Sequence, residues 1–144
     1  MANYGGGFTA YENFTADEDL TGQQWKLVKA ASTVGNVASA TSSCAPMPIG
    51  ILANDPSSGQ EALVAVFGFI KAKGRVNACF LSHGVFVSPA SDGFVEPALG
   101  TAGTEPIFGR WFGPRVTTVD ASLLGNTFIM PVPACIGASQ GAGY

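Results

Sequence analysis

The chain has 144 residues and a formal net charge of −3, and 12% of its residues are charged while 47% are hydrophobic. Because an average soluble protein carries about 25% charged residues, we expect other chains to cover part of its apolar surface, in a dimer, a trimer or a complex with a different protein. The seven basic residues are dispersed, which excludes the clustered positive charge that binding to nucleic acid requires.

The N-terminal segment, residues 1–18, is predicted to form a flexible arm. Three consecutive glycines, Gly5–Gly7, give it reach, and its aromatic side chains have nothing local to bury against. We expect these aromatic side chains to dock on a neighbouring chain as part of an interface: Tyr4, Phe8, Tyr11 and Phe14. A disordered terminus is the alternative interpretation. The segment lacks the regions of a signal peptide, and no long uncharged stretch fits a membrane helix, so we expect no membrane association.

A core domain of β structure is predicted over residues 19–132. In Gln23–Ala30, aromatic and aliphatic residues alternate with Lys26 as they do in a strand. Gly35 and Asn36 then predict the tip of a hairpin, since both residue types tolerate the left-handed conformation of tight turns.

The stretch PMPIGILANDP, residues 46–56, predicts the first strand of a second hairpin. Its prolines favour extended backbone, and the apolar run Ile49–Leu52 forms the strand, with Gly50 at a bulge or a close contact. Turn residues at 54–59 connect it to a longer strand, Glu61–Ile70, which we expect to pair with it antiparallel.

Both faces of the predicted strand Glu61–Ile70 are apolar, because one face carries Leu63, Ala65, Phe67 and Phe69 and the other carries Val64, Val66, Gly68 and Ile70. Such a strand is covered on both sides, inside a closed barrel or against another subunit. A buried helix is the alternative, which the β-branched and aromatic residues disfavour. We expect Val66 and Phe67 to be buried, and Phe67→Ala to cost about 3–5 kcal/mol of stability.

Shorter strands are predicted in the second half of the chain, over Val76–Leu81, Val85–Ser88 and Asn126–Val132. Asp92 and Gly93 predict a tight turn after the second of them. Residues 133–144 are predicted to form a flexible tail. No segment shows the sustained period of an amphipathic helix, so the fold class is all-β, a small β-barrel or β-sandwich.

Candidate catalytic and metal-binding residues are sparse. His83 is the only histidine, and a hydrolase centred on it would need Ser82 or Cys79 as its nucleophile. Because adjacent residues of a strand point to opposite faces, we interpret His83 as a turn residue before Gly84. One histidine and three scattered cysteines do not make a zinc site, and they are typical of assembly in a reducing cytosol. We therefore expect no enzymatic activity, no metal and no cofactor.

The stretch GRWFGPR, residues 109–115, concentrates arginine and aromatic residues: Arg110, Trp111, Phe112 and Arg115. Such a cluster is typical of hot spots in protein interfaces, of stacking platforms for single-stranded nucleic acid and of arginines packed over a core tryptophan. The acidic net charge favours the interface over the nucleic-acid platform. A carbohydrate-binding module, with Trp25, Trp111 and Phe112 as its stacking face, is the main alternative to a structural function.

Four stretches resemble the small capsid decoration proteins (cement or head-stabilising proteins) of tailed bacteriophages: DLTGQQWKLVKA, PIGILANDPSSGQEALVAVFGFIKAKG, HGVFVSPASDGFVEPALG and IFGRWF. The hairpin motif of that family is matched by Gly50, Ile51, Leu52, Asn54, Pro56 and Gly59, and the apolar strand after it by Val64, Val66 and Gly68. The resemblance covers residues 19–119, and the N-terminal arm and the C-terminal tail depart from it.

The resemblance implies a β-rich virion protein without enzymatic activity. Its partner would be the phage major capsid protein, which it would bind on the outer surface of the capsid and whose lattice it would stabilise. Self-association as a dimer or trimer, and assembly in the cytoplasm of a host bacterium, are part of the same expectation.

Overall fold

The computed structural model describes residues 8–40, 48–76, 80–98, 107–117 and 123–130 of the chain. Its strands in these ranges are β1 (Thr9–Ala16), β2 (Leu27–Ala30), β3 (Asn36–Ser39), β4 (Pro48–Leu52), β5 (Glu61–Lys73), β6 (Phe86–Pro89), β7 (Val95–Pro97), β8 (Gly109–Trp111) and β9 (Leu124–Ile129). A single 3-10 turn, η2 (Ser91–Gly93), is the helical segment within these ranges. The prediction of an all-β fold is therefore confirmed.

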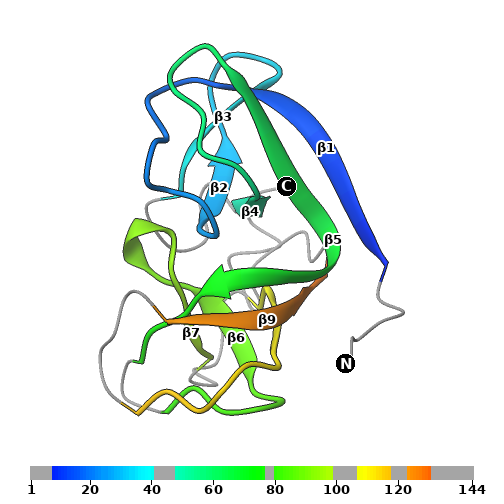
Figure 1. The fold of residues 1–144 in the computed structure, drawn as a ribbon, viewed down its shortest axis with the longest axis vertical. Coiled ribbons are helices and arrows are strands. Elements are labelled where there is room, and N and C mark those ends of the chain that lie inside the picture. Colours follow the sequence, from blue (N-terminus) through cyan, green and yellow to red (C-terminus); the bar gives the residue numbers. More distant parts are fainter. Residues whose placement is uncertain (1–7, 41–47, 77–79, 99–106, 118–122, 131–144) are drawn as a thin grey trace, which may run out of the picture.

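The strands form one sheet in the order β1-β3-β2-β4-β5-β9-β8-β6-β7. β1 also pairs with β5, so the first five strands in this order close into a barrel (Figure 1). The other four strands extend the sheet from the far end of β5. An isolated bridge between Gly74 and Val95 brings β7 back toward β5, so this second part curls around a core of its own.

The predicted hairpin of Ile49–Leu52 with Glu61–Ile70 is present as β4 and β5, which pair antiparallel. Its turn is held by the side chain of Asn54, which donates to the carbonyl of Glu61 and accepts from the amide of Leu63, both at 3.0 Å. The carboxylate of Asp55 accepts from the amides of Gly22 and Gln24 at 2.9 and 3.2 Å. The Asn-Asp pair thus fixes both the turn and the loop packed beside it.

β5 is 13 residues long and bends in its middle, where it passes from the barrel to the second part of the sheet (Figure 1). The pairing register with β1 shifts here by one residue, which marks a β-bulge. Gly68 sits beside the bulge with φ +106°, and a Cβ at this position would overlap the backbone carbonyl of Phe8. Only glycine fits a backbone with this φ and so close a neighbouring strand.

Two hydrophobic cores explain why both faces of β5 are apolar. Inside the barrel lie Ala16, Leu20, Val28, Val37, Leu52, Ala62 and Val64. Outside the barrel wall, Ala65 and Ile70 belong to a second core that is built around Trp111. β5 is thus covered on both sides where Val64 and Ala65 face the two cores, whereas Phe67 and Phe69 further along it stay partly exposed.

Val66 and Phe67 are half-buried, so the prediction that both are buried is wrong. Val66 lies at the margin of the barrel core, and Phe67 points away from both cores toward a group of aromatic side chains on the surface. Because less of its area leaves water on folding, we now expect Phe67→Ala to cost about 1–2 kcal/mol.

The predicted arm is also corrected. Thr9–Ala16 forms β1, which pairs antiparallel with β5 from Thr9 opposite Gly68 to Thr15 opposite Glu61, and parallel with β3. β1 closes the barrel because it covers the otherwise open edges of β3 and β5. The core therefore begins before residue 19. Residues 1–7 and 133–144, the rest of the predicted arm and the predicted tail, lie outside the described residues.

Several other predicted strands differ from those in the structure. β2 begins at Leu27 rather than Gln23, because Trp25 has φ +72° and breaks the extended conformation. No strand is described over Val76–Leu81, where Leu81 forms only an isolated bridge and residues 77–79 are not described. The last strand ends at Ile129 rather than Val132. The turn at Asp92 is confirmed, since it joins β6 and β7 with φ +62°.

Candidate protein interface

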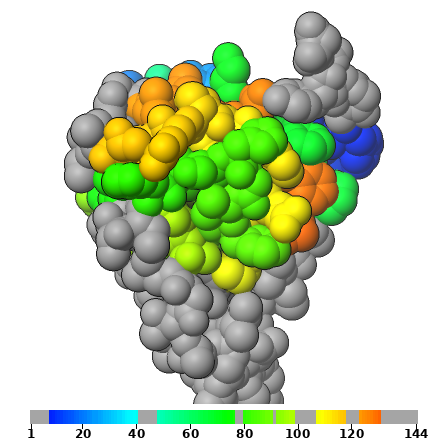
Figure 2. All heavy atoms as spheres, turned by 90° about the horizontal axis from the view of Figure 1, so that it is seen from below, coloured from blue at the N-terminus to red at the C-terminus, as the bar shows by residue number. Residues whose placement is uncertain are grey.

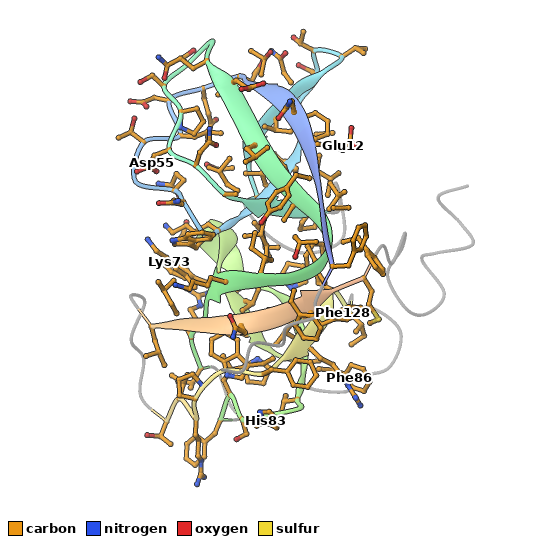
Figure 3. All side chains as sticks on the ribbon, turned by 45° about the vertical axis from the view of Figure 1, so that its right-hand side comes forward. Glu12, Asp55, Lys73, His83, Phe86 and Phe128 are labelled. Carbon is orange, nitrogen blue, oxygen red and sulfur yellow. The ribbon has the colours of Figure 1, made fainter. Side chains whose placement is uncertain are left out.

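A row of four side chains crosses the outer face of the second part of the sheet. Phe69 on β5 lies opposite Phe128 on β9, Phe128 lies opposite Arg110 on β8, and Arg110 lies opposite Phe86 on β6. Residues directly opposite one another in a sheet project to the same face. The row is therefore continuous across four strands, and Figure 3 shows Phe128 and Phe86 at this end of the molecule.

The row lines an apolar hollow of about 400 Å³. Its wall is completed by Phe112 and Met130, which directly follow β8 and β9. We call this surface the aromatic face, and define it by its lining residues Phe69, Phe86, Arg110, Phe112, Phe128 and Met130. Phe69 contacts both Phe128 and Phe112, with ring centroids 5.0 and 5.7 Å apart. The volume lies within the range of about 300–1,000 Å³ that is usual for binding sites.

Aromatic contacts continue beyond the hollow in both directions. Phe67 meets Phe128 edge to face at 5.5 Å, and Phe8 lies 6.4 Å from Phe67 with 68% of its surface exposed. At the other end, His83 packs edge to face on Phe112 at 5.2 Å. Figure 2 shows this end of the molecule, where yellow atoms of residues 107–117 lie beside green and orange atoms of the neighbouring strands. The exposed aromatic surface is thus larger than the hollow.

Two exposed arginines at this end each lie over a phenylalanine. The guanidinium carbon of Arg110 is 4.5 Å from the ring centre of Phe86, and that of Arg115 is 4.9 Å from the ring centre of Phe80. The second pair forms because backbone hydrogen bonds between Leu81 and Val116 bring the two segments together. Within the described ranges, no carboxylate lies at salt-bridge distance from either arginine.

Trp111 was predicted at the interface, but it is fully buried in the second core. It follows Arg110 on β8, and neighbouring residues of a strand point to opposite faces. Its indole Nε1 donates to the carbonyl of Pro114 at 2.8 Å. Glycines allow this packing: a Cβ at Gly74 or Gly113 would lie 2.8 Å from the indole ring, and one at Gly125 would overlap it. The arginines accordingly pack over phenylalanines on the surface and not over this tryptophan.

The remaining predicted interface residues are dispersed. Tyr4 lies outside the described residues. Phe8 is at the edge of the aromatic face, whereas Tyr11 is exposed further along β1 and Phe14 packs partly against the barrel core. Phe112 is half-buried and lines the hollow. The structure thus brings together Phe8, Arg110 and Phe112, and Arg115 lies at the same end.

Charge is divided unevenly between the two parts of the described molecule. Residues 8–66, most of which form the barrel, hold most of the carboxylates: Glu12, Asp17, Glu18, Asp19, Asp55 and Glu61. Residues 67–130 hold most of the bases: Lys71, Lys73, Arg75, Arg110 and Arg115. Figure 3 shows Glu12 and Asp55 at the opposite end of the molecule from Phe86. The aromatic face therefore belongs to the more basic end.

The pKa values of Asp19 and Lys26 are both lowered, and neither residue lines the aromatic face. Hydrogen bonds from the hydroxyl and amide of Thr21 lower the pKa of Asp19. Burial lowers the pKa of Lys26, with a further contribution from Lys73 nearby. The first shift reflects a local turn, and the second reflects the packing of Lys26 over the ring of Phe94.

Two alternative sites were predicted, a hydrolase site at His83 and a carbohydrate-stacking face. His83 is exposed in a turn, where its ring contacts Phe112, and Cys79 lies outside the described residues. The carbohydrate-stacking face is not formed, because Trp111 is buried. Among the residues that the structure describes, no three His, Cys, Asp or Glu side chains gather as in a metal site, and no helix is long and apolar enough to cross a membrane.

The fold is similar to one known from a phage head. The solved structure of the N base of head fiber gp8.5 in bacteriophage phi29 matches with a TM-score of 0.56 and 12% identity, over 91% of this chain and 100% of that one. At this identity the likeness shows the fold alone. No family model matches the chain, nor does any curated protein. Membership of the decoration proteins that the hairpin motifs resemble therefore stays a prediction.

Sequence reasoning missed most of the aromatic face. Phe69 and Phe128 were placed on predicted strands, but nothing in the sequence paired those strands with each other or with Arg110. Phe86 lay in a predicted strand with no special role. Nothing in the sequence indicated that Phe86 is exposed, since its neighbours Val87 and Ser88, one apolar and one polar, are both buried.

Proposed function

We propose that this protein is a structural component of a bacteriophage head, which binds the outer surface of the capsid and stabilises the lattice of major capsid proteins. The observation that carries the proposal is the likeness of nearly the whole fold to the base of a phage head fiber. The low content of charged residues adds to it, because a chain of this composition is suited to a surface that other proteins cover.

The aromatic face is the candidate attachment surface. A stable interface buries about 800 Å² on each partner, and each aromatic side chain contributes at most about 150–250 Å². Because most residues of the aromatic face are already half-buried, the face with Phe8 and Phe67 provides only part of this area, and residues around it would supply the rest. Aromatic residues and arginine are also the types that dominate binding energy in protein interfaces.

Stabilisation of the lattice would follow from binding alone. A protein that binds assembled subunits but not dissociated ones shifts the equilibrium toward the assembled state by mass action, and the shift grows with its occupancy. We place the protein on the virion exterior after assembly in the host cytoplasm, with self-association as a dimer or trimer, and we assign it no catalytic step.

Binding to undecorated shells of the phage major capsid protein tests the proposal. We expect the purified chain to sediment with the shells at a saturating ratio and to raise their temperature of disruption in calorimetry. The matched control is the same chain incubated with shells of an unrelated phage. If the chain stays in the supernatant with its own shells at micromolar concentration, the proposed function is wrong.

A further inference from the structure

We propose that the aromatic face recognises an apolar peptide segment carrying a carboxylate, and that Arg110 pairs with that carboxylate. The inference rests on the proposed function, because the segment would belong to the major capsid protein. It names the chemistry that the face selects, which the likeness of fold does not specify.

The position of Arg110 within the row is the first argument. It lies between Phe128 on one neighbouring strand and Phe86 on the other. The hollow around it is lined otherwise by apolar side chains. A partner that fits this surface has apolar groups on both sides of one negative charge, which describes an extended segment in which an acidic residue lies between aromatic or aliphatic ones.

The state of the Arg110 guanidinium is the second argument. Its guanidinium carbon lies 4.5 Å from the ring centre of Phe86, and because a phenyl ring has no lone-pair acceptor, this contact leaves the five N–H donors of Arg110 available to a further acceptor. In the described part of the chain no carboxylate pairs with it. Arg75 is different, since its Nε lies 3.6 Å from a carboxylate oxygen of Glu96. A planar donor group in an apolar surface is matched best by a carboxylate, which accepts two parallel hydrogen bonds.

The surroundings of the face favour the same partner. Arg115, stacked on Phe80, offers a second exposed cation at this end. Five of the seven bases of the described chain are in this part, whereas six of its eight acids belong to residues 8–66. An excess of one sign around a binding face speeds the approach of an oppositely charged partner and disfavours partners of the same sign.

A nucleic acid and a second copy fit less well. Phosphate backbones are bound by rows of basic side chains, whereas the hollow contains a single one. In a second copy, three carboxylates of the barrel end are already engaged: Asp55 accepts from two backbone amides, Asp17 accepts from the side chain of Asn36, and Asp19 accepts from Thr21. Glu12 and Glu61 are the exposed carboxylates that a second copy could still offer. A carboxylate from a different protein would not have to give up these hydrogen bonds in order to pair with Arg110.

Blocked dipeptides test the inference without the capsid. The probes are N-acetylated, C-amidated dipeptides of phenylalanine with aspartate, with asparagine and with lysine, titrated into isotopically labelled full-length protein and followed by NMR. We expect the aspartate dipeptide to bind about threefold to tenfold more tightly than its asparagine isostere, and the lysine dipeptide to bind most weakly. Resonances of Phe69, Phe128 and Arg110 should shift.

Variants locate the effect. Arg110→Gln should abolish the preference for aspartate over asparagine, while Lys29→Gln, which removes the same charge from the barrel, should preserve it. Phe128→Ala should weaken the binding of the aspartate and asparagine dipeptides by a similar factor. Circular dichroism melting curves check that each variant is folded.

The inference is overturned if the aspartate and asparagine dipeptides bind equally, if neither binds at millimolar concentration, or if the preference survives in Arg110→Gln. It is also overturned if an oligonucleotide of eight thymidines binds the face more tightly than the aspartate dipeptide. Binding to capsid shells distinguishes a failure of this inference from a failure of the proposed function. If the chain prefers the aspartate dipeptide but does not bind the shells, only the proposed function is contradicted. If the Arg110→Gln variant binds the shells as tightly as the wild type, only the inference is contradicted.

Discussion

In its first half β5 is a wall of the closed barrel, paired with β1 on one side and β4 on the other, and its side chains fill the barrel interior. Beyond Gly68 the same strand pairs with β9, and the sheet curls over Trp111 instead of closing by full pairing. Among the described residues, the single bridge from Gly74 to Val95 joins the ends of this second part.

The two parts of the sheet therefore have different roles: the barrel supports the fold, and the second part carries the candidate binding surface. The barrel hides its apolar residues inside and carries carboxylates outside, whereas the second part has an apolar core on one side of the sheet and the aromatic face on the other. Removing a core residue of the second part should therefore unfold it, while removing a residue of the aromatic face should change binding more than stability. Four substitutions test this, from the largest expected effect to the smallest.

Trp111→Ala should have the largest effect, a loss of about 3–5 kcal/mol in the free energy of unfolding, because the side chain is fully buried. Urea denaturation followed by circular dichroism measures it. Phe112→Ala is the matched control, since the neighbouring ring is only half-buried and should cost much less. Equal losses for both variants would contradict the division into a core side and a surface side.

Gly68→Ala should cost about 3 kcal/mol, because it adds backbone strain and a collision with β1 where the two parts of the sheet meet. The control is Gly35→Ala, which also has a positive φ but open space around it; backbone strain alone should cost it about 1–2 kcal/mol. The same denaturation experiment compares them. If the two variants are equally destabilised, the close contact of β1 with β5 at Gly68 does not contribute to the stability of the closed barrel.

Phe86→Ala should lower the free energy of unfolding by about 1 kcal/mol, because 45% of the residue's surface is exposed in the folded chain. It should nevertheless weaken sedimentation with capsid shells, since the ring supports Arg110. Val34→Ala is the matched control: this side chain is 98% exposed on the barrel and should affect neither quantity. A large loss of stability in Phe86→Ala would show that the face is part of the core.

Asp19→Asn should have the smallest effect, and it should depend on pH. The hydrogen bonds from Thr21 lower the pKa of Asp19 in the folded state, so its carboxylate stabilises the fold above the pKa of the unfolded chain, about 4. This contribution disappears as the pH falls through the lower pKa of the folded state. Melting temperatures of wild type and variant should therefore differ slightly at pH 6 and converge toward pH 3; a constant difference would contradict the assignment.

Local features of the fold could be predicted from the sequence. The hairpin of β4 and β5 follows from prolines, an apolar run and a turn built by Asn54 and Asp55, all close in the chain. The turn at Asp92 follows from the same turn chemistry. β1 was missed because three glycines and several aromatic residues indicated a free arm, whereas the open edges of β3 and β5 are properties of the assembled sheet.

The fold class and the long two-sided strand could be predicted from the sequence, because alternation and turn residues act over a few neighbouring residues. Which side chains form a surface depends instead on the tertiary structure. Arg110 and Trp111 are adjacent in the chain, but one lies in the exposed row and the other in the core. Phe69, Phe86 and Phe128 are far apart in the chain and become neighbours only through the pairing register of β5, β9, β8 and β6, which depends on contacts between distant strands.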